Sequence, residues 1–147
     1  MGRPALIAFV ALVAAAGPAF AATCPTSNAY TELSASEITT LLSGTTACYP
    51  AGGPYTNQEY LAGTALWDYK LGPSNSTDPS ANIGSVSITG STPGGITYTY
   101  TGNPSSTFNY VIWGLPARGP GNYDFCSPSG NSLPAQVAIE AGTAHHC

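Results

Sequence analysis

Charged side chains are scarce in this 147-residue sequence. Asp, Glu, Lys and Arg make up 7% of it, with three basic against seven acidic residues and a formal net charge of −4. So few cations cannot neutralise a row of phosphates, which argues against a nucleic-acid-binding protein. Residues 79–117 contain no Asp, Glu, Lys or Arg at all. Strand edges there would lack the charges that discourage pairing between molecules, so the sheet either closes on itself or pairs with another chain.

Groups suited to nucleophilic or metal chemistry are equally few. The two histidines, His145 and His146, stand beside Cys147 at the C-terminus, which is a poor place to hold an imidazole in a Ser–His–acid unit. The same tail could bind a metal ion, but a disulfide-bonded Cys147 has no thiolate to offer. Residues 90–95 have neither the lysine nor the following helix of a phosphate loop. We therefore expect no metal site and no cofactor.

Long apolar runs are limited to one, at the N-terminus. A basic start with Arg3 precedes the apolar residues 5–16, and Ala-Phe-Ala at 19–21 supplies small residues for a signal peptidase. Residues 1–21 are therefore predicted to be a signal peptide, and residues 22–147 a single domain with a modest core. No later stretch reaches the roughly 18 apolar residues that span a bilayer. We expect a secreted or periplasmic protein without a membrane span.

The cysteines number four, namely Cys24, Cys48, Cys126 and Cys147. An even number of cysteines in an exported protein normally forms disulfides. Four cysteines allow three connectivities, and spacing alone does not choose between them. Two bridges would each stabilise a small core by about 2–4 kcal/mol, because they restrict the unfolded chain.

One short helix is predicted over residues 35–43. Ser34 and Glu37 have capping-box spacing, so each side chain can satisfy a backbone N–H at the helix start. Gly44 stands where a left-handed residue would end the helix.

After the helix the apolar pattern changes to period two. Ile96, Tyr98 and Tyr100 alternate with threonines, which is typical of a strand with one buried and one solvated face. Short Gly-, Pro- and Asn-rich connections leave no room for helical crossovers, which favours antiparallel pairing. The sequence predicts an all-β fold, a small antiparallel β-barrel of about seven strands in a meander with one short N-terminal helix. A two-sheet β-sandwich is the alternative. The expected strands cover residues 45–49, 59–70, 83–89, 96–101, 107–113, 123–126 and 136–141.

Aromatic side chains are the main candidates for a binding function, since the sequence has nine Tyr and two Trp. Tyr and Trp combine apolar area with a polar tip, which suits ligand pockets. The other interpretation is that these rings only fill a small core. The candidate ligand-binding residues are Trp67, Tyr69, Tyr98, Tyr100 and Tyr110.

Two carboxylates between aromatic residues, Asp68 and Asp124, are candidates for glycoside chemistry. Strand alternation, however, places Asp68 on the face opposite Trp67 and Tyr69, which is most often the solvated face.

Four short motifs stand out along the chain, namely LLSGTTAC at 41–48, GTALWDYKLGP at 63–73, DP at 78–79 and YDFC at 123–126. Together they resemble small exported bacterial proteins with no assigned activity, over about residues 38–126. The resemblance implies no catalytic residues. It implies that the cysteines matching Cys48 and Cys126 form a recurring pair, which would leave the other two to join the termini.

The positions of the cysteines relative to the strands favour the same nested pairing, Cys48–Cys126 with Cys24–Cys147. Cys48 lies in the first predicted strand and Cys126 in the sixth, and early and late strands become neighbours when a meander closes. The local pairing, Cys24–Cys48 with Cys126–Cys147, competes because shorter loops form more readily.

Three functions follow from these patterns. The first is a non-catalytic binding module that holds a small or saccharide-like ligand among barrel aromatics. The second is a structural or adhesive surface protein that self-associates through its uncharged strands. The third is a hydrolase that uses a carboxylate pair.

N-terminal sequencing of exported protein is expected to begin at Ala22, because the Ala-Phe-Ala of residues 19–21 follows an uninterrupted apolar run. An acylated chain beginning at Cys24 would reverse this expectation. Residues 21–23 lack the aliphatic residue, and the small residue directly before the cysteine, that a lipoprotein site needs.

Overall fold

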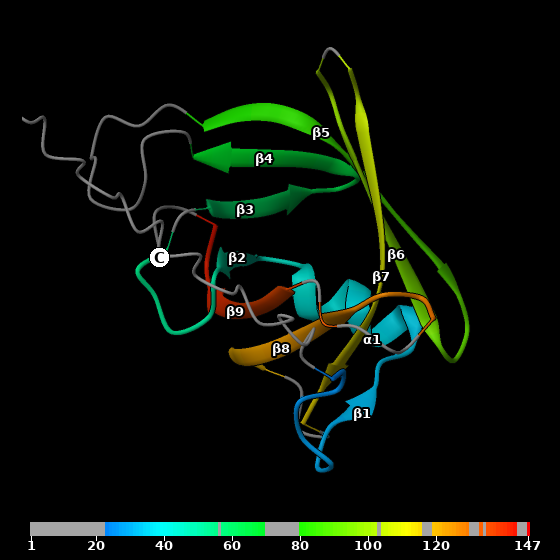
Figure 1. Ribbon diagram of the computed structural model, residues 1–147. Helices are drawn as coiled ribbons and strands as arrows, with labels where there is room; N and C mark the ends of the chain where they lie inside the picture. Colours follow the sequence, from blue (N-terminus) through cyan, green and yellow to red (C-terminus); the bar gives the residue numbers. More distant parts are fainter. Residues whose placement is uncertain are drawn as a thin grey trace, which may run out of the picture.

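Figure 1 shows the computed structural model of the chain. It describes residues 23–55, 57–69, 80–102, 104–115, 119–129, 133, 135–143 and 147, without the side chains of Tyr69 and Ser80. The predicted signal peptide and both histidines lie outside these residues. Within them, no helix has the length and apolar character needed to cross a membrane.

Eight antiparallel strands close into a barrel. Each strand from β2 to β9 pairs with the next along the chain, and β9 pairs back with β2. A short ninth strand, β1, pairs with β7. The strands are β1 (Thr31–Glu32), β2 (Thr45–Tyr49), β3 (Asn57–Ala62), β4 (Ala65–Tyr69), β5 (Ser80–Gly90), β6 (Gly94–Tyr100), β7 (Ser106–Gly114), β8 (Gly121–Cys126) and β9 (Ala135–Ala141).

The predicted antiparallel meander barrel is confirmed, with eight strands and one outer strand in place of about seven. The difference arises chiefly in the stretch 59–70, which was expected as one interrupted strand and forms β3 and β4. Gly63, at φ +67°, lies in the tight turn between them, where a residue with a side chain would be strained. The alternative sandwich is not formed, because the sheet closes on itself.

The helix α1 (Ala35–Leu42) has the predicted capping box and ends one residue earlier than expected. The backbone N–H of Ser34 donates to the Glu37 carboxylate at 2.7 Å, and the N–H of Glu37 donates to Ser34 Oγ at 3.4 Å. Gly94, at the start of β6, lets the chain before α1 approach closely. A Cβ there would collide with the backbone of Ser34 and Ala35.

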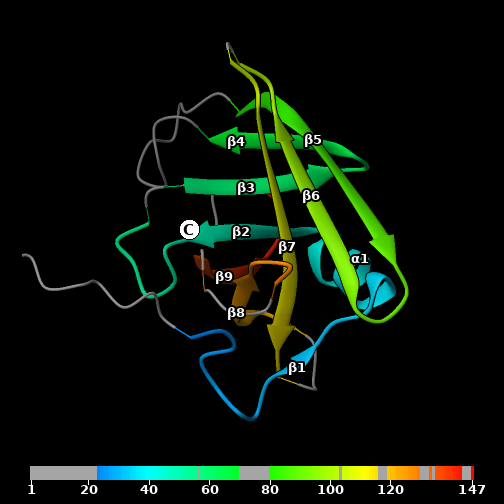
Figure 2. The same ribbon diagram turned by 45° about the vertical axis from the view of Figure 1, so that its right-hand side comes forward.

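The helix closes one end of the barrel with its apolar face. Ile38, Leu41 and Leu42 are buried and pack into one core with inward-facing side chains of the barrel strands. In Figure 2, α1 lies beside the turn that joins β5 to β6. Burial of side chains of this size is worth about 1.5–3 kcal/mol each. The strand residues of this core include Leu66, Val86, Ile96, Ile112 and Ile139.

Both disulfides are formed, but the predicted nested pairing is wrong. Cys24 bonds to Cys126 and Cys48 to Cys147, each with a Cα–Cα distance of 5.8 Å. The prediction placed Cys48 and Cys126 on neighbouring strands. In the barrel the neighbours of β2 are β3 and β9, so β9 separates Cys48 from the β8 strand that carries Cys126. Two disulfides indicate an oxidising environment.

The N-terminal segment is fixed to the outside of β8 by a buried carboxylate. Asp124 Oδ2 accepts hydrogen bonds from the backbone N–H of Thr26 at 2.6 Å and from its hydroxyl at 2.7 Å. Gln136 on β9 donates to Oδ1 at 3.0 Å. Asp124 is fully buried, and these bonds compensate for its loss of water. The adjacent Cys24–Cys126 bridge reinforces the same attachment.

Replacing both Cys24 and Cys126 by Ser is expected to lower the free energy of unfolding by about 2–4 kcal/mol, because the bridge closes a segment with a sequence separation of 102. Urea unfolding of the double variant beside the oxidised wild type measures the loss. Peptide mapping of the wild type is the control, and a fragment that links Cys48 to Cys126 would contradict the pairing.

Candidate functional site

The barrel end opposite α1 holds a cavity of about 500 Å³. Its walls are mostly aromatic, and Asn57, Glu59 and Ser106 supply polar groups. Tyr49 and Phe108 are 39% and 47% exposed, respectively, so both rings are partly open to solvent. The other aromatic rings of the lining are Tyr98, Tyr100, Tyr110 and Phe125, and small or branched side chains complete it at Ala47, Ala135 and Val137.

Strand register explains why these rings share one wall. In the pairing of β6 with β7, Tyr98 lies opposite Phe108 and Tyr100 opposite Ser106. Antiparallel partners point to the same face of a sheet, so these side chains all enter the barrel. Thr97, which lies between the inward-facing Ile96 and Tyr98, is hydrogen-bonded to Asn109 at an exposed position. The alternation predicted for this segment is therefore confirmed.

The rings contact one another in stacked, tilted and edge-to-face pairs. Tyr98 and Tyr110 have centroids 5.9 Å apart at 69°, and Tyr100 and Phe108 have centroids 5.7 Å apart at 76°. Phe125 on β8 joins the group at 5.7 Å from Tyr110. Such pairs fix the rings in place, because aromatic edges and faces attract each other.

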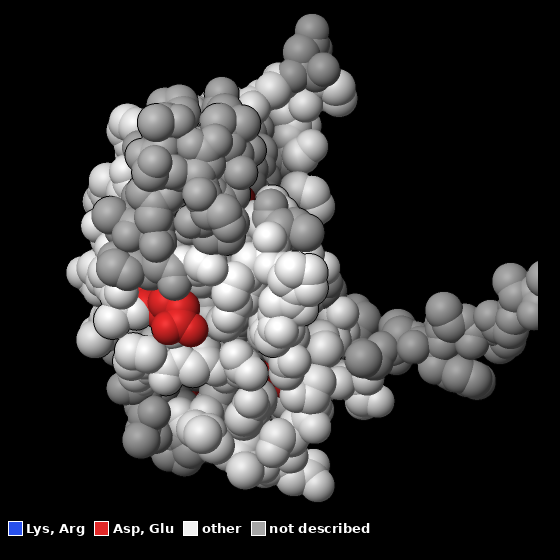
Figure 3. All heavy atoms as spheres, turned by 90° about the vertical axis from the view of Figure 1, so that its left-hand side faces the viewer, with Lys and Arg blue, Asp and Glu red and all other residues white. Residues whose placement is uncertain are grey.

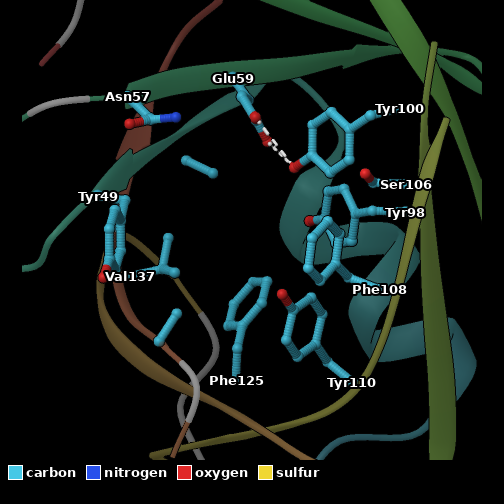
Figure 4. Close-up of a pocket in the computed structure, with 12 residues that line it drawn as sticks. Tyr49, Asn57, Glu59, Tyr98, Tyr100, Ser106, Phe108, Tyr110, Phe125 and Val137 are labelled. Atoms are coloured by element: carbon cyan, nitrogen blue, oxygen red, sulfur yellow. Dashed lines mark hydrogen bonds between the residues drawn. The ribbon is translucent and has the colours of Figure 1, made fainter. Parts of the chain in front are cut away.

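Glu59 places a carboxylate inside this aromatic cavity. The Tyr100 hydroxyl donates to its two oxygens at 3.0 and 3.1 Å, as Figure 4 shows. The pKa of Glu59 is raised to about 7, chiefly by burial; the Tyr100 hydrogen bond opposes this rise, and the negative charge of Asp68 adds to it. Asp68 lies directly opposite Glu59 in the pairing of β3 with β4, so both acids face inward.

The tyrosines around Glu59 remain neutral phenols in the physiological pH range. Burial raises the pKa values of Tyr98 and Tyr100, and the nearby Glu59 charge adds to the effect. The same two causes raise the pKa of Tyr110. Their hydroxyls therefore act as hydrogen-bonding groups and not as negative charges.

The candidate binding residues divide between the cavity and the outside. Tyr98, Tyr100 and Tyr110 meet in the cavity lining. Trp67 lies on the other face of β4, where its ring stacks on Tyr60 with centroids 6.3 Å apart. The side chain of Tyr69 is not among the parts of the chain that the structure describes.

The expectation that Asp68 takes the solvated outer face is wrong. Trp67 takes the outer face and Asp68 the inner one, opposite Glu59, because this end of the barrel holds an open cavity that admits polar groups between its aromatic walls. Asp124, the other candidate acid, lies outside the barrel under the N-terminal segment and does not meet Asp68.

Sequence reasoning missed Glu59, Tyr49, Phe108 and Phe125. Glu59 alternates with Leu61 in β3, and Phe108 with Tyr110 in β7, so period two could have placed each on an inner face. The contact between Glu59 and Tyr100 has no local signal, because 41 residues separate them.

Positive charge is missing from the described part of the chain, since the three Lys and Arg residues all lie outside it. On the face shown in Figure 3 the described atoms are almost entirely uncharged, with one acidic patch. No group of three or more His, Cys, Asp or Glu that could hold a metal ion occurs among the described residues. Among the lining residues of the cavity, the ionisable charge is the negative charge of the Glu59 carboxylate.

Comparison of the chain with protein-family models, with curated proteins and with solved structures found no match. Its function has to be inferred from the cavity.

Raising the pH from 5 to 8 is expected to remove about 2–3 kcal/mol of stability through Glu59. Its pKa is about 7 in the folded protein against an ordinary 4.5. Between these values the folded chain holds a proton that the unfolded chain has released, so the free energy of unfolding falls as the pH rises. Glu59→Gln, which keeps an acceptor for Tyr100, should lack this contribution.

Urea unfolding of both proteins across this pH range provides the measurement, and the difference between the two curves isolates Glu59. Parallel curves would mean that Glu59 is hydrated in the folded state.

Proposed function

We propose that this protein is a secreted or periplasmic, non-catalytic binding module that holds a small ligand in the open end of its barrel. The cavity carries the proposal. Its volume of about 500 Å³ lies within the range of small-molecule sites, and its combination of aromatic walls with a few polar groups is typical of them. The two disulfides and the predicted signal peptide are consistent with export.

Closure of the sheet favours binding over a structural or adhesive role. Strands β2 to β9 each pair on both sides over at least part of their length, so no strand of the barrel offers a wholly free edge for another copy to extend. The longest partly free stretch is residues 106–110 of β7, which pair with β6 but not with β8. The uncharged strands β5, β6 and β7 are therefore part of the wall of a closed barrel.

A hydrolase is the second candidate, because Glu59 and Asp68 lie opposite each other on the inner face. A carboxyl with a pKa of about 7 suits a general acid, and a second carboxylate is the partner that glycoside hydrolysis requires. Turnover of chromogenic glycosides that is abolished by both Glu59→Gln and Asp68→Asn would replace the binding proposal.

A thermal-shift screen of the oxidised mature protein tests the binding proposal. A ligand present at about 100 times its Kd adds about 2.7 kcal/mol, which should raise the Tm by on the order of 10 °C for a domain of this size. The panel should include saccharides, amines, carboxylates and apolar alcohols.

Two variants with the same substitution locate the site. Ala135 lines the cavity, whereas Ala62 is exposed at the end of β3. Ala135→Phe should fill the cavity and abolish the shift, and Ala62→Phe should leave it unchanged. A shift that survives Ala135→Phe, or a complete absence of shifts across the panel, would contradict the proposal.

A further inference from the structure

The cavity places the Glu59 carboxyl group among aromatic rings. Glu59 and Asp68 bring two carboxyl groups to the inner face, and aromatic rings supply most of the surrounding wall. None of the described lining residues is Lys, Arg or His. An ionised carboxylate in such surroundings is costly unless an opposite charge pairs with it.

We propose that the ligand is an organic ammonium ion whose charged group pairs with Glu59 among the cavity's aromatic rings. This inference rests on the proposed binding function and names the chemical class of its ligand. An ammonium group attached to an apolar body would satisfy the carboxylate and the aromatic wall together.

The ring arrangement suits a cation because rings lie on opposite sides of the cavity. Tyr49 on β2 faces Tyr98 and Phe108 of β6 and β7 across it, as Figure 4 shows. In an eight-stranded barrel, β2 and β6 are half a turn apart. The face of an aromatic ring carries partial negative charge, and several such faces around one site attract ammonium groups by cation–π interaction.

The polar groups are also arranged for a donor. Tyr100 already donates its hydroxyl proton to Glu59, so its oxygen retains lone pairs that can accept from an N–H. Glu59, with two oxygens, can accept a further charge-assisted hydrogen bond. An anionic ligand, by contrast, would be repelled by Glu59 and Asp68.

The inference is tested by calorimetry with matched pairs of probes. Tyramine and choline are cations at pH 5 and at pH 8, and tyrosol and 3,3-dimethylbutan-1-ol are neutral molecules of similar shape. At pH 8, where Glu59 is mostly ionised, at least one cation should bind about tenfold or more tightly than its neutral counterpart.

The preference should weaken at pH 5, where Glu59 is mostly protonated. The other titratable groups that face it are Asp68 from β4, Tyr98 and Tyr100 from β6, Tyr110 from β7 and Tyr49 from β2.

Removal of one negative charge inside or outside the barrel provides the control. Glu59→Gln should reduce the affinity for the cation on the order of 30-fold and leave that for the neutral probe unchanged. Glu140 lies on β9 outside the cavity lining, and Glu140→Gln makes the same change in net charge without the loss of affinity. Near-ultraviolet circular dichroism verifies that both variants are folded.

The possible results separate the two proposals. Equal affinity for cations and neutral probes, or a preference that persists in Glu59→Gln, overturns the ammonium inference and leaves the binding function standing. Binding of a saccharide such as methyl β-glucoside, when neither cation binds, likewise overturns the ammonium inference and leaves the binding function standing. Failure of every probe here and in the wider screen contradicts the binding function as well.

Discussion

Pairing of β2 with β9 is the interaction on which the rest of the structure depends. Residues Thr45 to Cys48 of β2 pair with Ala138 to Ala141 of β9, and without this pairing the meander would be an open sheet with two free edges. The Cys48–Cys147 bridge ties β2 to the residues that follow β9, so it secures the same closure covalently. Only a closed sheet has an interior, and the core and the cavity are the two ends of that interior.

The two ends differ because α1 covers only one of them. At the covered end aliphatic side chains pack without polar groups, and the burial of Ile38 and Leu42 contributes to stability. At the open end Glu59 is held between aromatic rings, which costs stability as soon as it ionises. A protein selected only for stability would place an apolar side chain there. The destabilising carboxyl is therefore the strongest indication that this end serves a function.

Local patterns were enough to predict part of this structure. The capping box at Ser34 and Glu37 fixed the start of α1, and the alternation around Tyr98 predicted which rings enter the barrel. The predicted disulfide pairing failed because it depended on which strands become neighbours in the closed barrel. In the eight-stranded barrel β9 lies between the strands that carry Cys48 and Cys126, and no local sequence pattern indicates this order. The faces of Trp67 and Asp68 were also beyond local reasoning, because the open cavity that accepts a charged side chain inside the barrel exists only once the sheet has closed.

Direct titration of the Glu59 carboxyl carbon by ¹³C NMR tests whether the barrel holds this acid largely out of water between the aromatic rings of its open end. The carboxyl signal of Glu59 is assigned as the one that is absent from the spectrum of Glu59→Gln. A midpoint near pH 7 is expected in the oxidised protein. A midpoint near the ordinary value of 4.5 would mean that water reaches Glu59 freely, and it would contradict the buried position of Glu59 and the function proposed for the cavity.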